Sequence, residues 1–283
     1  PKVSRLLTFA KQSGLVEIRI NDPAESSQSL ERAIEQHFGV PKVRVVAVPQ
    51  DADESEWLQR VAQYTAGHLN SIIHSKMILG MAWGTTLDAI SQHLTPKRCH
   101  DLDIVQLNGS GNVYTINNFY TSEIYSRFAH NYGGRAFLFP VPAFFDYRET
   151  KQAMWRESSI RRLIDMTNRA DLLIYSIGSA HGRVPSYVYT EGYLSAQDFE
   201  ELQREGVVGD IATVFFRKDG SHQDIPLNSR ATGPDLSLFQ KSRHALCVVS
   251  GLGKVNGLRS ALIGGLMNEL ILDEQTARAL LET

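Results

Sequence analysis

The sequence predicts an α/β protein with a mainly parallel, Rossmann-like β-sheet, helices on both faces and a small antiparallel excursion. Seven short runs of apolar, often β-branched residues follow one another along the chain. Helical patterns separate most of them, and the runs are apolar on both faces, which is typical of strands covered from both sides. Residues 211–216 differ, because a tight turn at residues 218–220 follows them directly and favours an antiparallel pair.

The alternation of predicted helices and strands begins at residue 29. We expect strands at residues 43–48, 76–80, 103–107, 136–139, 172–177, 245–249 and 270–272. We expect helices that include residues 54–73, 86–94, 151–169 and 254–267. No internal repeat and no low-complexity tract interrupts this alternation.

The first twenty residues have a pattern of their own. An apolar helical face precedes Gly14 and an alternating strand pattern follows it; the face is Val3, Leu6, Leu7 and Ala10, and the strand positions are Val16, Ile18 and Ile20. The polar, turn-rich segment 21–27 predicts a boundary between domains at residues 1–20 and 21–283. The net charge is −2, but residues 1–20 contribute +3. A basic start on an acidic body indicates nucleic-acid contact, and a solvated helix face explains the charge equally well.

Composition excludes several classes of protein. The 283 residues are 42% hydrophobic and 21% charged, which is ordinary for a globular chain with a sizeable core. Cys99 and Cys247 have no metal-binding spacing, so we expect neither a disulfide framework, a metal site nor a cofactor. We find no signal segment and no apolar run long enough to span a bilayer, so we expect a cytoplasmic protein without a membrane partner. Because the chain starts at Pro1 instead of Met, we expect it to be a fragment.

Two predicted strands end in turns suited to an anion. Gly84, Thr85 and Thr86 stand directly before a helix, where backbone N–H groups and the helix dipole attract a phosphate. The alternative is that a threonine merely caps its own helix. The second turn runs from Asn108 through Gly109, Ser110 and Gly111; its small residues allow a concave nest for an oxyanion, or else form a flexible surface loop.

Two further turns follow strands nearer the C-terminus. Gly178 and Ser179 precede His181, which could bind a sugar hydroxyl or act as a base, although a lone loop histidine usually does neither. The fourth turn, at residues 250–254, ends in Lys254, which can pair with a phosphate or stay solvated in the first helical turn. Asp210 supplies an acceptor for sugar hydroxyls, or simply begins a strand.

These turns predict one shared site for a small anionic ligand, because ligands of open parallel sheets bind beyond the carboxyl ends of the strands. The aromatic-rich segment 117–121 could pack over this ligand, although core packing is the commoner role. We assign the phosphate to Gly84, Thr85, Thr86 and Lys254.

The whole chain resembles the SorC/DeoR-type family of sugar-binding transcriptional regulators. The most specific matches are Trp83-Gly84-Thr85-Thr86, the segments 105–109 and 208–211, and the C-terminal segment 272–281. Residues 1–7 look like most of that family's recognition helix, and residues 14–18 like its exit into a strand. The resemblance implies a helix-turn-helix remnant whose Lys2, Ser4 and Arg5 contact operator DNA.

The resemblance also implies an effector domain with the fold of ribose-phosphate isomerases and glucosamine-phosphate deaminases. Carried over by position, it implies that the sugar is bound by Asn108, Gly109, Ser110, Gly111, Gly178, Ser179 and Asp210. Members of this family bind phosphorylated sugars and assemble into dimers or tetramers, so we expect a homodimer or homotetramer. In the deoxyribonucleoside-regulator branch, a lysine just before the nest glycine forms an imine with its sugar. Asn108 occupies that place here, and an amide cannot form a Schiff base, so we expect noncovalent recognition.

Three classes of function compete. A ligand-controlled regulator, most simply a repressor of a carbohydrate catabolic operon, explains the basic helix–strand start. A phosphosugar isomerase or deaminase needs a positioned base among Asp210, His181 and Glu191, and these residues show no recognisable spacing. A pure oligomerisation module has no need for four glycine-rich turns. We therefore expect a non-enzymatic regulator.

Overall fold

A computed structural model of the chain describes residues 23–49, 51–112, 119–179 and 186–282. Its centre is a seven-stranded sheet in the order β1-β9-β8-β5-β2-β3-β4, in which every neighbouring pair is parallel. The strands are β1 Lys42–Val46, β2 Ile78–Met81, β3 Asp103–Gln106, β4 Arg135–Phe137, β5 Leu172–Tyr175, β8 Ala245–Val249 and β9 Glu269–Asp273. The predicted parallel α/β fold is therefore confirmed, with each strand inside or within two residues of its expected run.

The central strands are apolar throughout because both of their faces are buried. In β5, Leu172 and Ile174 belong to the hydrophobic core on one face of the sheet. Leu173 and Tyr175 belong to the core on the other face. Successive side chains of a strand point to opposite faces, so a run without polar residues supplies both cores at once.

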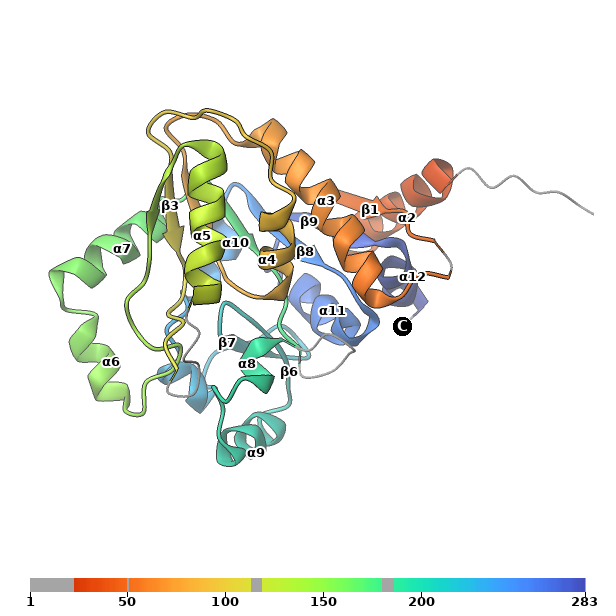
Figure 1. Ribbon diagram of the computed structural model, residues 1–283. Helices are drawn as coiled ribbons and strands as arrows, with labels where there is room; N and C mark the ends of the chain where they lie inside the picture. Colours follow the sequence, from red (N-terminus) through yellow and green to blue (C-terminus); the bar gives the residue numbers. More distant parts are fainter. Residues whose placement is uncertain (1–22, 50, 113–118, 180–185, 283) are drawn as a thin grey trace, which may run out of the picture.

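Helices cover both faces of the sheet (Figure 1). One layer holds α3 Glu54–Ile72, α4 Thr85–Gln92 and α5 Phe119–Tyr132. The opposite layer holds α2 Pro23–Phe38, α6 Arg148–Met154, α7 Ser158–Asn168, α10 Ser237–Lys241, α11 Val255–Ile263 and α12 Glu274–Glu282. The short helices α8 Tyr187–Thr190 and α9 Ala196–Arg204 lie beside the small second sheet, below the main sheet in Figure 1.

The antiparallel excursion is present, but its strand limits differ from those expected for residues 211–216. It consists of β6 Val207–Ile211 and β7 Val214–Arg217, joined by a two-residue turn. Ala212 and Thr213 form this turn with φ values of 48° and 69°, as the twist of a tight hairpin requires. The sequence conceals the turn because neither residue is glycine or asparagine.

The single helix expected at residues 151–169 is also wrong, because α6 and α7 are separate. Trp155 ends the first helix and packs edge-on against Phe139, with ring centroids 5.6 Å apart. Ser158 then starts the second helix. The local pattern favours one helix here, but the structure has a break at Trp155, where the indole ring contacts Phe139.

The expected polar break at residues 21–27 is helical from residue 23 onward. Pro23 begins α2, and proline fits the first turn of a helix because its missing N–H has no helical partner there. Ile34 of this helix is fully buried in the core beside β1. Residues 1–22, with Lys2, Ser4 and Arg5, lie outside the described part of the chain.

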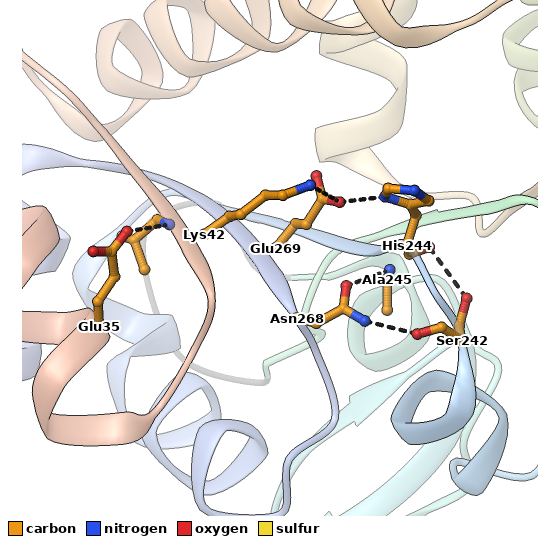
Figure 2. A network of polar contacts seen from close by, with 8 residues as sticks. Glu35, Lys42, Ser242, His244, Ala245, Asn268 and Glu269 are labelled. Carbon is orange, nitrogen blue, oxygen red and sulfur yellow. Dashed lines mark hydrogen bonds and ion pairs between the residues drawn. The ribbon is translucent and has the colours of Figure 1, made fainter.

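A polar network joins the amino ends of three strands (Figure 2). Glu269 at the start of β9 accepts hydrogen bonds from Lys42 at the start of β1 and from His244 beside β8. Asn268 accepts from the backbone N–H of Ala245 at 2.8 Å and donates to the carbonyl of Ser242 at 2.7 Å. This network therefore lies at the end of the sheet opposite the carboxyl ends of the strands.

Candidate functional site

A cavity lies beyond the carboxyl ends of β2, β3 and β5. The four predicted turns come together as expected, since the strands that precede them are neighbours in the order β8-β5-β2-β3. Seven of the predicted residues line the cavity: Gly84, Thr85, Thr86, Asn108, Gly178, Asp210 and Lys254. The other walls come from the β6–β7 hairpin and from the start of α8.

The N-terminus of α4 opens into this cavity. Gly84 is its capping residue, with φ 141° and ψ 176°, a conformation that side chains other than hydrogen strongly disfavour. Among the described residues no side chain caps the helix, so the alternative that a threonine caps it is wrong. Thr86 is buried and turns its hydroxyl toward Ser176 instead, at 3.2 Å. The free N–H groups and the dipole of this turn therefore remain available to an anion.

Lys254 brings a buried ammonium group to the same place. Its Nζ donates to the hydroxyl oxygens of Thr86 and Ser176, at 3.3 and 3.2 Å. Within the described residues, no carboxylate lies within 4 Å of it. Burial lowers the pKa of Lys254 to about 8, against the opposing effect of more distant acidic groups that include Asp210. The lysine is thus a cation at neutral pH whose charge no ion pair compensates.

The turn that carries Lys254 uses its own N–H groups elsewhere. Gly251 donates to the side chains of Asp273 and Thr276, at 3.2 and 3.0 Å. Leu252 donates to the carboxylate of Glu54 at 3.3 Å. The turn therefore positions the lysine and does not itself form a second anion nest.

Asp210 is a buried carboxyl group on the other side of the cavity. Its Oδ2 accepts from the N–H of Thr213 at 3.0 Å, and its side chain is hydrogen-bonded to Tyr189. Its Oδ1 is buried without a hydrogen-bond partner among the described residues. Burial raises the pKa of Asp210 to about 6, although these hydrogen bonds and Lys254 oppose the rise. An acceptor atom left unpaired in a cavity is suited to a ligand hydroxyl.

Gly178 allows this carboxylate to come close. The two backbones are joined as a small antiparallel bridge, in which the N–H of Gly178 donates to the carbonyl of Asp210 at 2.8 Å. A Cβ atom on Gly178 would lie only 1.8 Å from Oδ1 of Asp210. Ser179, the next predicted residue, points away and donates to the carbonyl of Gly253 at 2.8 Å. It therefore ties two turns together and does not line the cavity.

The turn after β3 contributes Asn108 alone. Asn108 is 1% exposed, and its Oδ1 has no hydrogen-bond partner among the described residues. The N–H of Gly109 donates to Thr232 at 3.0 Å, and that of Gly111 to the carbonyl of Val141. These N–H groups are occupied, so the predicted oxyanion nest is not formed by them.

Gly109 allows close backbone packing and does not bind an anion. A Cβ on Gly109 would lie 2.3 Å from the carbonyl oxygen of Val141, so the glycine permits two backbones to pack closely. Ser110 accepts a hydrogen bond from Tyr193 through its carbonyl, at 3.0 Å. Neither residue lines the cavity, and Gly111 does not either.

Other candidates are placed less centrally. Glu191 is exposed, and its carbonyl accepts from Asn112, so it is not a base within the cavity. His181, residues 117–118 and the side chains of residues 119–120 lie outside the described part of the chain. Among the residues that the structure describes, no cluster of metal-ligating side chains occurs. No described helix is long and apolar enough to cross a membrane.

Sequence reasoning missed several residues of the site. Ser176 directly follows β5, and the hydroxyl at that strand end was an available signal. Tyr189 and Thr213 had none, because their positions depend on α8 and on the hairpin.

The fold and the site together define a ligand-binding α/β domain, and comparisons with known proteins identify its family. Residues 22–282 match the family described as "Putative sugar-binding domain". The deoxyribonucleoside regulator of Bacillus subtilis is 31% identical over 280 residues, covering 99% of this chain and 88% of its own. The chain belongs to the SorC/DeoR-type family of sugar-binding transcriptional regulators.

Solved structures support the same assignment. A domain of a possible sugar-binding transcriptional regulator from Arthrobacter aurescens is 46% identical, with a TM-score of 0.85 and coverage of 92% of this chain and all of that one. The full-length sorbitol operon regulator of Klebsiella pneumoniae shares the fold at 21% identity, with a TM-score of 0.82, and the two chains are covered to 99% and 89%.

Proposed function

We propose that this chain controls transcription of a carbohydrate catabolic operon by binding a phosphorylated sugar without a covalent bond. The observation that carries the proposal is the uncapped N-terminus of α4 beside the buried ammonium of Lys254. A phosphate group supplies hydrogen-bond acceptors for the free N–H groups and an anionic partner for the ammonium group of Lys254. Gly84, Thr85 and Thr86 then hold the phosphate together with Lys254.

The sugar hydroxyls complete the site. Asp210 and Asn108 each have a buried oxygen without a partner among the described residues, and a hydroxyl donates to both kinds of acceptor. Because Asn108 is an amide, it holds the sugar through hydrogen bonds and forms no imine. Borohydride treatment in the presence of 2-deoxyribose 5-phosphate should therefore leave no stoichiometric adduct, as checked by mass spectrometry.

The link to DNA rests on the relatives and on the basic N-terminal residues. Relatives are named as an erythritol catabolism regulatory protein and a sorbitol operon regulator. We assign operator contact to Lys2, Ser4 and Arg5, and repression to the ligand-free assembly of two or four chains. An effector releases DNA only if it binds the non-operator arrangement more tightly, so affinity for the sugar phosphate should fall when operator is present.

A panel of sugar phosphates with their unphosphorylated sugars tests the site. A phosphosugar at ~100 times its dissociation constant stabilises the protein by ~2.7 kcal/mol, which raises the midpoint of thermal unfolding. The unphosphorylated partner should have no effect at the same concentration. Lys254→Met should abolish the shift, whereas the exposed Lys241→Met should preserve it. Equal affinity for a sugar and its phosphate would contradict the proposal.

One observation favours an isomerase or deaminase as a second candidate. Asp210 has a pKa of about 6 inside a cavity, which suits a general base near neutral pH. The relatives are named as regulators, and a shared fold does not establish an activity. Turnover of a phosphosugar by the purified protein, lost in Asp210→Asn, would favour the enzyme.

A further inference from the structure

A second cavity of about 360 Å³ lies on the sheet face that α6 and α7 cover. It shares no residue with the first cavity, although its walls include the direct neighbours of that site: Leu107 precedes Asn108, and Val214 follows Thr213. Its volume falls within the usual range for small-molecule sites. Its lining combines both kinds of side chain. The apolar ones are Leu107, Phe139, Trp155, Ile164 and Val214, and the polar ones are Lys151, Thr167, His222, Gln223, Asn228, Thr232 and Asp235.

Lys151 of α6 places an ammonium group at this cavity. Its Nζ lies 5.4 Å from the centre of the Trp155 ring, and its hydrogen bond to the carbonyl of Asn228 is long, at 3.4 Å. No carboxylate of the described residues lies within 4 Å of it. Burial lowers the pKa of Lys151, and the nearby charge of Arg148 lowers it further. An anion in the cavity would relieve both effects.

His222 adds a second polar group without a full set of partners. Its side chain is 10% exposed, and its Nδ1 is buried with no hydrogen-bond partner among the described residues. The other ring nitrogen lies 3.8 Å from the carboxylate of Asp235. Buried nitrogen atoms without a partner are uncommon in folded proteins, and they often indicate a missing ligand or water.

We propose that this cavity is a second ligand site, which binds a small organic acid with one carboxylate and an apolar body. The carboxylate pairs with Lys151 and accepts from His222, while the apolar body packs on Val214 and Ile164. A metal ion fits poorly, because Asp235 is the only carboxylate among the described residues of the lining.

The three tryptophans of the chain provide the readout. Trp155 lines the second cavity and Trp83 the first, whereas Trp57 is buried in α3. In protein labelled with 5-fluorotryptophan, each residue gives its own fluorine NMR signal, and Trp155→Phe and Trp83→Phe assign them. Benzoate is the probe, and benzamide is its neutral counterpart of nearly the same shape.

Benzoate should shift the Trp155 signal saturably and leave the Trp83 signal in place. Benzamide should bind roughly tenfold more weakly or worse, because it lacks the charge that pairs with Lys151. Lys151→Met should weaken benzoate binding to a similar degree, whereas Lys254→Met should not change the affinity for benzoate. If Lys151→Met does not fold, the comparison of benzoate with benzamide on the wild-type protein decides alone. No saturation at millimolar benzoate, equal binding of benzamide, or a shift of Trp83 alone would overturn the proposal.

Discussion

Lys254 and Asp210 are two groups whose charged forms the fold disfavours. Burial lowers the pKa of the lysine to about 8 and raises that of the aspartate to about 6. Both are mostly charged at neutral pH, and neither has an ion-pair partner within 4 Å among the described residues. A functional site commonly retains such groups at a cost in stability, because the ligand supplies their partners.

Asp210→Asn should therefore stabilise the protein and weaken ligand binding. Because the pKa of Asp210 is raised on folding, the stability linked to it is present below the usual aspartate pKa and is lost as the pH rises through about 6. Removing the charge should increase the free energy of unfolding at pH 7.5 by at most about 3 kcal/mol. It should also weaken phosphosugar binding roughly tenfold, through the lost charge-assisted hydrogen bond. Urea unfolding and calorimetry measure the two effects.

Asp198→Asn is the matched control for this variant. Burial alone would raise the pKa of Asp198, but hydrogen bonds from Ser195 and Arg230 outweigh it and lower the pKa. The same substitution should therefore destabilise the protein at Asp198. A loss of stability at pH 7.5 in Asp210→Asn would contradict the role of burial assigned here.

Ligand affinity should depend on pH through Lys254. The ammonium form binds the phosphate, so affinity falls as the pH rises above the lysine pKa of about 8. Between pH 7.5 and 9.5 the dissociation constant should rise roughly tenfold or more, since each unit above the pKa costs about a factor of ten. Calorimetry across this range checks it. Lys254→Met should bind weakly and with no such dependence, and a flat profile in the wild type would exclude the lysine as the phosphate partner.

At the scale of elements, the turns at the strand ends show where sequence reasoning works. Four of the apolar runs lead into turns of glycine or small hydroxyl residues, and parallel strands bring their carboxyl ends together, so Gly84, Asn108 and Gly178 could be placed at one site. The role of Gly109 could not be predicted. Its backbone packs against Val141, and a local pattern does not show which distant segment comes close.

Two element boundaries were predicted wrongly, for different reasons. At the end of α6, Trp155 contacts Phe139, and the linear pattern does not contain this contact. The turn at Ala212 has a local hydrogen bond from Thr213 to Asp210, but neither turn residue is the glycine or asparagine typical of such a turn. Strands buried on both faces can be recognised in the sequence because nearly all of their residues are apolar.

Gly178→Ala tests how tightly the β5 turn packs against the hairpin. The added Cβ would lie 1.8 Å from Oδ1 of Asp210, so the carboxylate or the backbone must move. We expect a loss of about 1–3 kcal/mol in the free energy of unfolding, together with weaker ligand binding. In the Asp210→Gly background the loss should shrink, since the two residues are in contact. Gly67→Ala is the control: its Cβ meets nothing within 4 Å, and alanine favours its helix by about 0.5–1 kcal/mol. Equal effects at both glycines would rule out the clash.

At the scale of the whole molecule, the polar groups at the carboxyl ends of the strands differ from those at the amino ends. At the carboxyl ends of the strands, Lys254 donates to two hydroxyl groups but has no ion-pair partner among the described residues, and the Oδ1 atoms of Asp210 and Asn108 have no hydrogen-bond partner among them. The amino ends hold the network of Lys42, His244 and Glu269, in which the central carboxylate has two donors (Figure 2). The site is thus built into a framework whose opposite end secures three adjacent strands.

That network should contribute to stability against acid. Burial alone would raise the pKa of Glu269, but hydrogen bonds from His244 and Lys42 outweigh it and lower the pKa below 4.5, the usual value. A lowered pKa gives stability that is fully present above the usual value and is lost as the pH falls through the folded-state pKa. Glu269→Gln should reduce the free energy of unfolding at pH 7 by about 1–3 kcal/mol, because it removes a buried charge-assisted contact. It should also flatten the decline below pH 4.5, as followed by urea unfolding at several pH values. Glu56→Gln removes an exposed ion pair with Arg60 and should cost at most about 0.5 kcal/mol at any pH. If the two variants lost stability equally and kept the same acid limb, the network would be no more than a surface contact.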